Sequence, residues 1–301
     1  MNILLTGANG FLGRSILEET SENYNVKTLS RTFGDYKIFL EKQIPVFREN
    51  FDLVIHAAGK AHSIPKTVLE KKEFNDVNVV GTLNLLKGLE QSNMMPKQFV
   101  FISSVAVYGK DLGFNIDEEY PLAALDAYGL SKIQAEIAIL EWCEKHNVIC
   151  TVLRLPLLVG KRPPGNLGAM IKAIDKGIYF NIDNGKARKS MILVTDVAKF
   201  IFIAVNSGGI FNLTDDVHPN FNELSKALSN NEKSYFSIPL PIAKVFGKLG
   251  DVLGNHSPIN SVKVKKITSN LTFNNSKAKQ LFNWKPKSVL EYIKMVDIRD
   301  L

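Results

Sequence analysis

The sequence predicts an α/β fold of the Rossmann type, in which a doubly wound parallel sheet is followed by a smaller, mixed C-terminal substrate lobe. Two observations predict it. Apolar segments of strand length alternate with segments of helical period through the first half of the chain, and three glycines directly follow the first strand. The 301 residues, 45% of them hydrophobic and 22% charged, suffice for one large and one small domain.

The first thirteen residues have the order of strand, glycines and helix that a dinucleotide requires. Residues 2–6 form a short apolar run, and 14–20 can continue as a helix. Between them, one glycine permits a tight turn, the second lets the backbone approach a pyrophosphate, and the third lets the helix sit close to the strand. We therefore expect dinucleotide contacts from Gly7, Asn9, Gly10, Phe11, Leu12 and Gly13.

The second predicted strand, 25–29, ends in Ser30 and Arg31. At this strand end an acid would bind the 2′-hydroxyl of NAD, whereas an arginine would accept the 2′-phosphate of NADP. Ser30 stands where the acid would be, and Arg31 follows it. The pair favours NADP(H) over NAD(H), with a plain surface charge as the alternative reading of Arg31.

Two apolar runs, 52–58 and 99–103, predict buried central strands separated by a helix over 74–90. His56 lies inside the first of these strands. We interpret it as a hydrogen-bonded core imidazole rather than as a metal ligand or base.

A loop over 121–127 precedes a predicted helix from Tyr128 to about His146. Tyr128 and Lys132 are four residues apart, so they share one face of this helix. An ammonium group there would lower the pKa of the phenol from its usual value near 10. A further strand, 148–153, follows.

The composition changes after Gly160. We assign 1–160 to a dinucleotide-binding domain and 161–301 mainly to the substrate lobe, and we expect 185–215 to return in part to the first domain. The expected elements are a turn-rich segment 161–168, a helix 169–176, a strand or loop 178–184, a strand 190–194, a helix 196–206 and a strand 209–213.

From Phe221 onward the chain reads as helices and loops. One helix carries apolar residues at helical spacing, namely Ile242, Val245, Phe246, Leu249, Val252 and Leu253. We expect this face to pack into the lobe, with a membrane-surface helix as the alternative.

The formal charge is +7, with lysines concentrated late in the chain. They lack interleaved aromatics and any nucleic-acid-binding motif, so we expect a solvated face or attraction of an anionic small substrate rather than nucleic acid. Cys143 and Cys150 are too few for a disulfide framework or a thiolate metal site. With no targeting signal and no apolar run of membrane-spanning length, we expect a cytoplasmic protein without a metal or a membrane span.

Together these pieces resemble the extended short-chain dehydrogenases/reductases, in particular the NAD-dependent epimerase/dehydratase group that acts on nucleotide sugars. The resemblance covers nearly the whole chain. Its motifs are Gly7-x-x-Gly10-x-x-Gly13, His56-Ala-Ala-Gly59, Asn78-x-x-Gly-Thr, Ser104 before Val-Ala-Val-Tyr-Gly, and Tyr128-x-x-x-Lys132.

The resemblance implies roles for these residues. Tyr128 would be the general acid/base at the sugar O4, Ser104 would hydrogen-bond the same oxygen, and Lys132 would bind the nicotinamide ribose. Further implied cofactor contacts are Ala57, Ala58, Gly59, Asn78, Ser103, Pro156 and Tyr128 itself. Implied substrate contacts, besides Ser104, are Val105, Asn166, and Arg188 or Lys189 at the diphosphate.

The residues after Ser104 help to separate the reactions of this family. Val105 and Ala106 replace the acidic pair of its 4,6-dehydratases, so dehydration is not expected. We favour an NADPH-dependent 4-ketoreductase of a UDP-4-keto-6-deoxyhexose in surface-polysaccharide biosynthesis, because Arg31 fits exchangeable NADPH. The alternatives are a UDP-hexose 4-epimerase with bound NAD and a non-catalytic NADP-binding regulator.

Two positions depart from the family pattern. Leu193 replaces the usual Tyr or His, and Phe39-Leu40 stands where an acid that touches adenine would be expected. A lipid-linked sugar diphosphate is a further candidate substrate, given the basic and partly apolar C-terminal lobe. By analogy with the family we expect a homodimer formed through helices 74–90 and 128–146.

Overall fold

The computed structural model describes residues 1–20, 22–61, 65–92, 95–229, 235–253 and 260–299. Its centre is a seven-stranded sheet in the order β11-β7-β5-β4-β1-β2-β3, and every neighbouring pair is parallel. The strands are β1 Asn2–Thr6, β2 Asn25–Ser30, β3 Tyr36–Lys37, β4 Leu53–His56, β5 Gln98–Ser104, β7 Ile149–Leu155 and β11 Gly209–Asn212. The order reverses between β1 and β4, which is where such sheets bind ligands.

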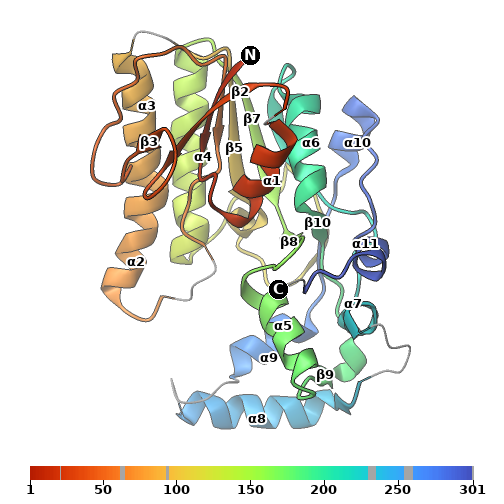
Figure 1. The fold of residues 1–301 in the computed structure, drawn as a ribbon. Coiled ribbons are helices and arrows are strands. Elements are labelled where there is room, and N and C mark those ends of the chain that lie inside the picture. Colours follow the sequence, from red (N-terminus) through yellow and green to blue (C-terminus); the bar gives the residue numbers. More distant parts are fainter. Residues whose placement is uncertain (21, 62–64, 93–94, 230–234, 254–259, 300–301) are drawn as a thin grey trace.

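Helices cover both faces of this sheet (Figure 1). One face carries α1 Phe11–Thr20 and α6 Val194–Ala204, and the other carries α3 Gly81–Gln91 and α4 Ala127–Lys145. Successive side chains of β1 supply both cores, because Ile3 and Leu5 pack on the α1 side while Leu4 packs on the α3 side. The predicted Rossmann-type fold is therefore confirmed.

The rest of the chain adds short parallel strand pairs and small helices. The pairs are β8 Leu157–Val159 with β10 Met191–Leu193, β9 Asn181–Ile182 with β12 Ser237–Ile238, and β6 Gly113–Ile116 with β13 Leu271–Phe273. The helices are α5 Gly165–Asp175, α7 Phe221–Ser229, α8 Leu240–Leu253, α9 Ser261–Thr268, α10 Ser276–Phe282 and α11 Val289–Met295, with 3-10 turns at Val105–Tyr108 and Asp183–Gly185. Of these elements, α5, α7, α8, α9 and β9 form the lower lobe in Figure 1, whereas α10 lies beside α6.

The helix predicted over 74–90 is longer and is interrupted. It comprises α2 Val68–Asn75, a π-helical turn Asp76–Val80, and α3. It begins earlier because Thr67 caps it, with its hydroxyl accepting a hydrogen bond from the Glu70 backbone N–H. The π-helical turn carries Asn78, and such turns occur frequently at functional sites.

Two further elements also differ from the sequence prediction. The helix expected at 169–176 begins at Gly165 after Pro164, so half of the predicted turn-rich segment is helical. The strand expected at 190–194 pairs with β8 rather than with the main sheet, whereas β11 joins that sheet beside β7.

One packing prediction was wrong. The large apolar residues of α8 do not pack into the lobe; its buried residues are Ala243, Gly247 and Gly250. Among the described residues, no helix is both long enough and apolar enough to cross a membrane.

His56 is the core imidazole that its apolar strand indicated. Its Nδ1 lies 2.7 Å from Thr6 Oγ1 and its Nε2 lies 2.9 Å from Thr82 Oγ1. Burial lowers the pKa of His56 to about 3, so the ring is neutral.

Candidate active site

A cleft of about 1160 Å³ lies where the loops after β1, β2, β4 and β5 meet the start of α4. Most of the predicted cofactor and catalytic residues line it. They are Gly7, Asn9, Gly10, Phe11, Leu12, Gly13, Ser30, Arg31, Ala57, Ala58, Gly59, Ser103, Ser104, Tyr128, Lys132 and Pro156. The cleft thus lies at the carboxyl ends of the strands, at the reversal of strand order.

The glycine loop can exist only with glycines at two of its positions. Gly7 has φ +75°, and a Cβ there would lie 2.6 Å from the Ala58 backbone nitrogen. A Cβ at Gly13 would lie 2.0 Å from the carbonyl oxygen of Gly7. Because α1 begins at Phe11, the unpaired N–H groups of its first turn open toward the cleft. This arrangement fits a dinucleotide pyrophosphate.

The end of β2 presents an ion pair rather than a lone arginine. Arg31 Nη2 lies 2.9 Å from Glu41 Oε1, and the guanidinium sits 5.8 Å from the centre of the Phe39 ring. Both Arg31 and Glu41 line the cleft. The sequence did not lead us to Glu41, which lies well beyond the strand end where an acid is usually sought. An acid is therefore present at the place where NAD and NADP would differ.

The catalytic candidates come from β5 and α4. Asp126 caps α4 by accepting hydrogen bonds from the N–H groups of Tyr128 (3.1 Å) and Gly129 (3.0 Å), which fixes the first turn. The Tyr128 and Ser104 side chains are hydrogen-bonded. Lys132 Nζ donates to the carbonyl of Ile102 at 2.6 Å.

The pKa shifts of Tyr128 and Lys132 differ from those that the sequence predicted. Burial raises the pKa of the Tyr128 phenol, and the hydrogen bond with Ser104 opposes this only in part. Burial also lowers the pKa of Lys132 to about 7, against the opposing effect of the Glu136 carboxylate. The prediction that Lys132 lowers the pKa of Tyr128 was wrong for this structure, because its Nζ is turned to the Ile102 carbonyl and lies 4.2 Å from the centre of the Phe101 ring.

Asn78 supports the cleft from behind without lining it. Its Oδ1 accepts from the Lys60 N–H at 2.7 Å, and its Nδ2 donates to the Lys60 carbonyl at 3.1 Å and to Ser131 Oγ at 2.9 Å. The side chain therefore ties the loop after β4 to α4. A Cβ at Gly59 would lie 3.2 Å from Asn78 Oδ1, so the two positions are packed closely together.

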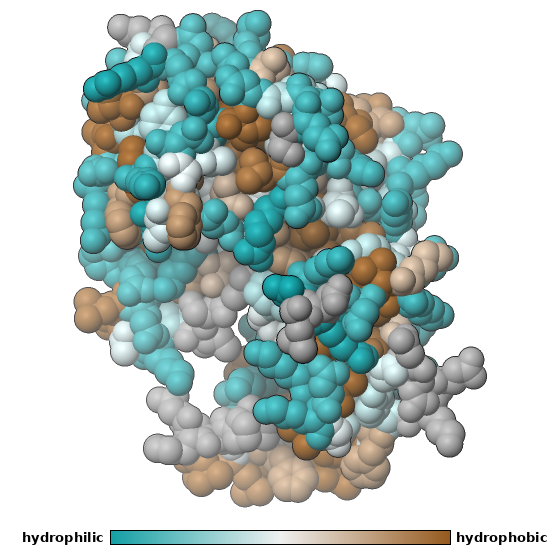
Figure 2. Space-filling model, in the orientation of Figure 1, coloured by the Kyte–Doolittle hydropathy of each residue, from teal (hydrophilic) through white to brown (hydrophobic). Residues whose placement is uncertain are grey.

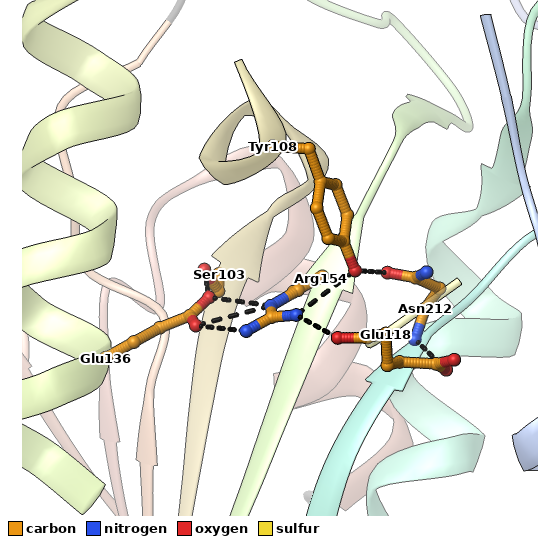
Figure 3. Close-up of polar contacts among 6 residues, drawn as sticks. All are labelled: Ser103, Tyr108, Glu118, Glu136, Arg154 and Asn212. Atoms are coloured by element: carbon orange, nitrogen blue, oxygen red, sulfur yellow. Dashed lines mark hydrogen bonds and ion pairs between the residues drawn. The ribbon is translucent and has the colours of Figure 1, made fainter. Parts of the chain in front are cut away.

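A buried polar network, which the sequence motifs did not predict, lies behind Ser103. Arg154 Nη2 lies 2.8 Å from Glu136 Oε2, and Ser103 Oγ donates to the same carboxyl group. Arg154 Nη1 donates to the Tyr108 hydroxyl at 3.1 Å, which in turn donates to Asn212 Oδ1 at 2.8 Å. Figure 3 shows this network, which also includes Glu118 and joins α4 to β5, β7 and β11. The available signal was an arginine within an apolar strand and a glutamate one helical turn after Lys132.

The predicted substrate contacts other than Ser104 lie outside the cleft lining. Val105 begins the 3-10 turn after Ser104, and Asn166 is exposed on the first turn of α5. Arg188 is paired with Glu223, with Nη2 3.3 Å from Oε1. Lys189 is half-buried, and burial lowers its pKa to about 8. The cleft is lined on this side by Arg162 and Pro164 instead.

Among the described residues, no group of three or more His, Cys, Asp or Glu side chains could hold a metal ion.

Comparison with known proteins gives consistent matches. Residues 3–214 match the model of the NAD dependent epimerase/dehydratase family. The chain is 30% identical to an N-acetyl-alpha-D-glucosaminyl-diphospho-ditrans,octacis-undecaprenol 4-epimerase of Escherichia coli O157:H7, over 92% of this chain and 88% of that protein. It is 26% identical to a UDP-glucose 4-epimerase of Vibrio cholerae, over 96% of this chain and 92% of the other.

A solved UDP-glucose 4-epimerase from Thermotoga maritima has the same fold. It superposes with a TM-score of 0.75 at 21% identity, covering 98% of this chain and 97% of that one.

Proposed function

The chain belongs to the NAD-dependent epimerase/dehydratase family, and we propose that it is a 4-epimerase of a sugar carried on a diphosphate, working with retained NAD. It is an NAD(P)-dependent enzyme of this family, which sets aside the non-catalytic regulator considered above. The observation that carries the proposal is that Ser104, Tyr128 and Lys132 share one cleft with the glycine loop.

Some residues of the cleft would bind the cofactor, and others would act on the sugar. The dinucleotide, when bound, would accept a hydride from the sugar C4 and later return it to the other face. The loop from Gly7 to Gly13 would hold its pyrophosphate, and Lys132 would bind its ribose. Tyr128 would take the proton from the sugar O4 during oxidation and return it during reduction, while Ser104 would hydrogen-bond the same oxygen.

The protonation state of Tyr128 indicates which side chain must move during the catalytic cycle. With its pKa raised, Tyr128 is protonated at neutral pH and ready to act as the acid. To act as the base it needs a cation close by. Lys132 lies one helical turn away, so its Nζ must leave the Ile102 carbonyl and turn toward the phenol.

Glu41 favours an epimerase over a reductase. Its carboxylate already pairs with Arg31 and can accept a hydrogen bond from a ribose 2′-hydroxyl, whereas it would repel the 2′-phosphate of NADP. A 4-epimerase regenerates its NAD in each turnover and so does not need to exchange it. The 30% identical relative is also a 4-epimerase.

The NADPH-dependent 4-ketoreductase of a UDP-4-keto-6-deoxyhexose is the second candidate. Ser30 rather than an acid ends β2, and Arg31 lines the cleft where a 2′-phosphate would lie. For this reaction Arg31 would have to exchange Glu41 for the phosphate.

The carrier of the sugar is a nucleotide or a lipid diphosphate. The relatives named above act on one or the other. Asn166, Arg188 and Lys189 stay proposed contacts for the diphosphate, and Arg188 would have to exchange Glu223 for it. Arg162 joins them as a fourth candidate because it lines the cleft.

A homodimer through α3 and α4 also stays a proposal. The two helices lie side by side in Figure 1. Leu83, Leu130 and Ile137 on them are between 40% and 48% exposed, which supplies apolar surface for a second copy. Light scattering that finds a monomer at assay concentration would contradict this proposal.

The function is tested by assaying UDP-N-acetylglucosamine, UDP-glucose and the undecaprenyl-linked sugar without added dinucleotide. We expect interconversion of the 4-epimers of at least one substrate. Tyr128→Phe is the control for contaminating activity. Turnover that requires NADPH and a 4-keto sugar would replace the epimerase with the reductase.

A further inference from the structure

Helix α8 packs on the rest of the protein through its smallest residues. Ala243, Gly247 and Gly250 are buried against the lobe. A Cβ at Gly247 would lie 3.2 Å from the backbone of Ser261 and from Val264 Cγ2, so α9 approaches too closely for a larger residue there. The large apolar side chains of α8 therefore face away from the protein.

These side chains form one continuous face. Ile242, Phe246, Leu249 and Leu253 recur at intervals of three and four residues and are between 49% and 63% exposed. Val245 and Val252 extend the face along one edge, at 58% and 86% exposure. Figure 2 shows the apolar band along the lower rim of the molecule, where Figure 1 places α8. A contiguous apolar surface of this kind marks an interaction site.

The segment around this face is basic. Residues 240–268 contain five lysines and a single acid, Asp251. On α8 itself, Lys248 lies one turn before Val252 at the edge of the apolar face, Lys244 lies a further turn before Lys248, and both lysines are exposed. An apolar face bordered by lysines is typical of helices that lie in the plane of a membrane interface. Lysines near such a surface are attracted to anionic lipid headgroups.

We propose that α8 docks the protein on an anionic lipid bilayer. Ile242, Phe246, Leu249 and Leu253 enter the boundary between headgroups and acyl chains, and Lys248, with Lys244 one turn before it, supplies positive charge near the headgroups. The charge argues against a second copy of the chain as the occupant, because two such faces would bring like charges together. Docking holds whichever C4 reaction the cleft performs. That a lipid-linked sugar diphosphate would thereby reach the cleft without leaving the bilayer rests on the proposed function.

Vesicle flotation of the full chain tests docking without any substrate. The vesicles are phosphatidylcholine alone, or phosphatidylcholine mixed with phosphatidylglycerol. We expect the protein to float with the mixed vesicles and to dissociate as salt is raised. Phe246→Ser with Leu249→Ser should weaken partitioning by about tenfold or more. Lys244→Gln with Lys248→Gln should remove most of the preference for anionic vesicles.

A matched control removes exposed apolar side chains elsewhere. Leu281 on α10 and Met295 on α11 are 63% and 83% exposed, and replacing both with serine should leave flotation unchanged. Circular dichroism and turnover of a soluble substrate check that each variant is folded, since none of these residues lines the cleft.

Two results would overturn the proposal. The first is flotation that is absent from the wild type or equal in the wild type and the Phe246→Ser, Leu249→Ser variant. The second is a concentration-dependent dimer, measured by light scattering, that this variant loses; that result would assign the face to a second copy of the chain.

Discussion

Replacing Glu136 with glutamine should destabilise the protein and disturb the catalytic end of its cleft. Glu136 and Arg154 are 1% and 3% exposed, and their closest atoms are 2.8 Å apart. The substitution keeps the shape of the side chain but leaves the guanidinium buried without its counter-charge. Breaking a buried pair in this way costs about 3–5 kcal/mol of the free energy of unfolding. At about 2 °C per kcal/mol for a chain of this size, Tm should fall by roughly 6–10 °C.

A double-mutant cycle isolates the pair from the rest of the network. Arg154→Met should be costly alone, because it leaves the carboxylate unpaired. Adding Glu136→Gln to it should cost less than the sum of the two single changes, by roughly 1–3 kcal/mol, because no buried charge then lacks a partner. Lys97→Gln, which breaks an exposed pair with Asp52 at 3.6 Å, is the control and should change stability by less than about 0.5 kcal/mol.

Urea unfolding followed by circular dichroism measures the free energies. Additive single changes, or a Glu136→Gln protein within about 1 kcal/mol of the wild type, would refute the reasoning. The same variant has a kinetic signature. The Glu136 carboxylate raises the pKa of Lys132 against the lowering effect of burial, so its removal should shift the pH profile of turnover to lower pH.

Three further predictions concern single side chains. Tyr128→Phe should lower turnover by about 10²–10⁴-fold and leave dinucleotide affinity unchanged in a fluorescence titration, because the phenol handles the proton but does not anchor the cofactor; turnover that survives would contradict its role. Glu41→Gln should release Arg31 and raise the affinity for NADP(H) relative to NAD(H) by about tenfold in the same titration; an unchanged ratio would show that the pair does not set the preference. The pKa of His56 is about 3 in the folded protein, so below about pH 6.5 only the unfolded chain takes up this proton and stability is lost as pH falls, by about 1.4 kcal/mol per pH unit. Urea unfolding at several pH values should show that His56→Asn flattens the curve between about pH 4 and 6.5, and an equally steep curve would place the protonated group elsewhere.

The parts of the fold that the sequence predicted are those set by local sterics and burial. Strands covered on both faces are mostly apolar, so β4 and β5 were visible as short apolar runs. The glycine loop was visible because contacts as close as 2.0 Å leave no room for a Cβ at Gly13. The cofactor side of the cleft could be predicted for the same reason.

The side-chain contacts that the sequence did not predict depend on the orientation of each side chain in the folded protein. Spacing placed Tyr128 and Lys132 on one face of α4, but it could not reveal that the Ile102 carbonyl captures the ammonium. Arg31 lines the cleft, but its partner Glu41 reaches it only through the path of the loop between β3 and β4. Arg188 likewise turns to Glu223 on α7.

The apolar period of α8 is the same whether its large side chains are packed or exposed. The small residues Ala243, Gly247 and Gly250, at spacings of four and three, were the available signal that a different face of the helix packs.

The measurement that tests the central claim most directly is the identity of the dinucleotide that the purified protein retains. The protein is purified without added cofactor and denatured, and the released dinucleotide is identified and quantified against the protein. A retained-cofactor 4-epimerase predicts NAD in an amount close to one per chain, with no turnover gained from added NADPH. A protein that releases no dinucleotide, binds NADPH in preference to NADH, and reduces a 4-keto sugar would contradict the epimerase and establish the reductase.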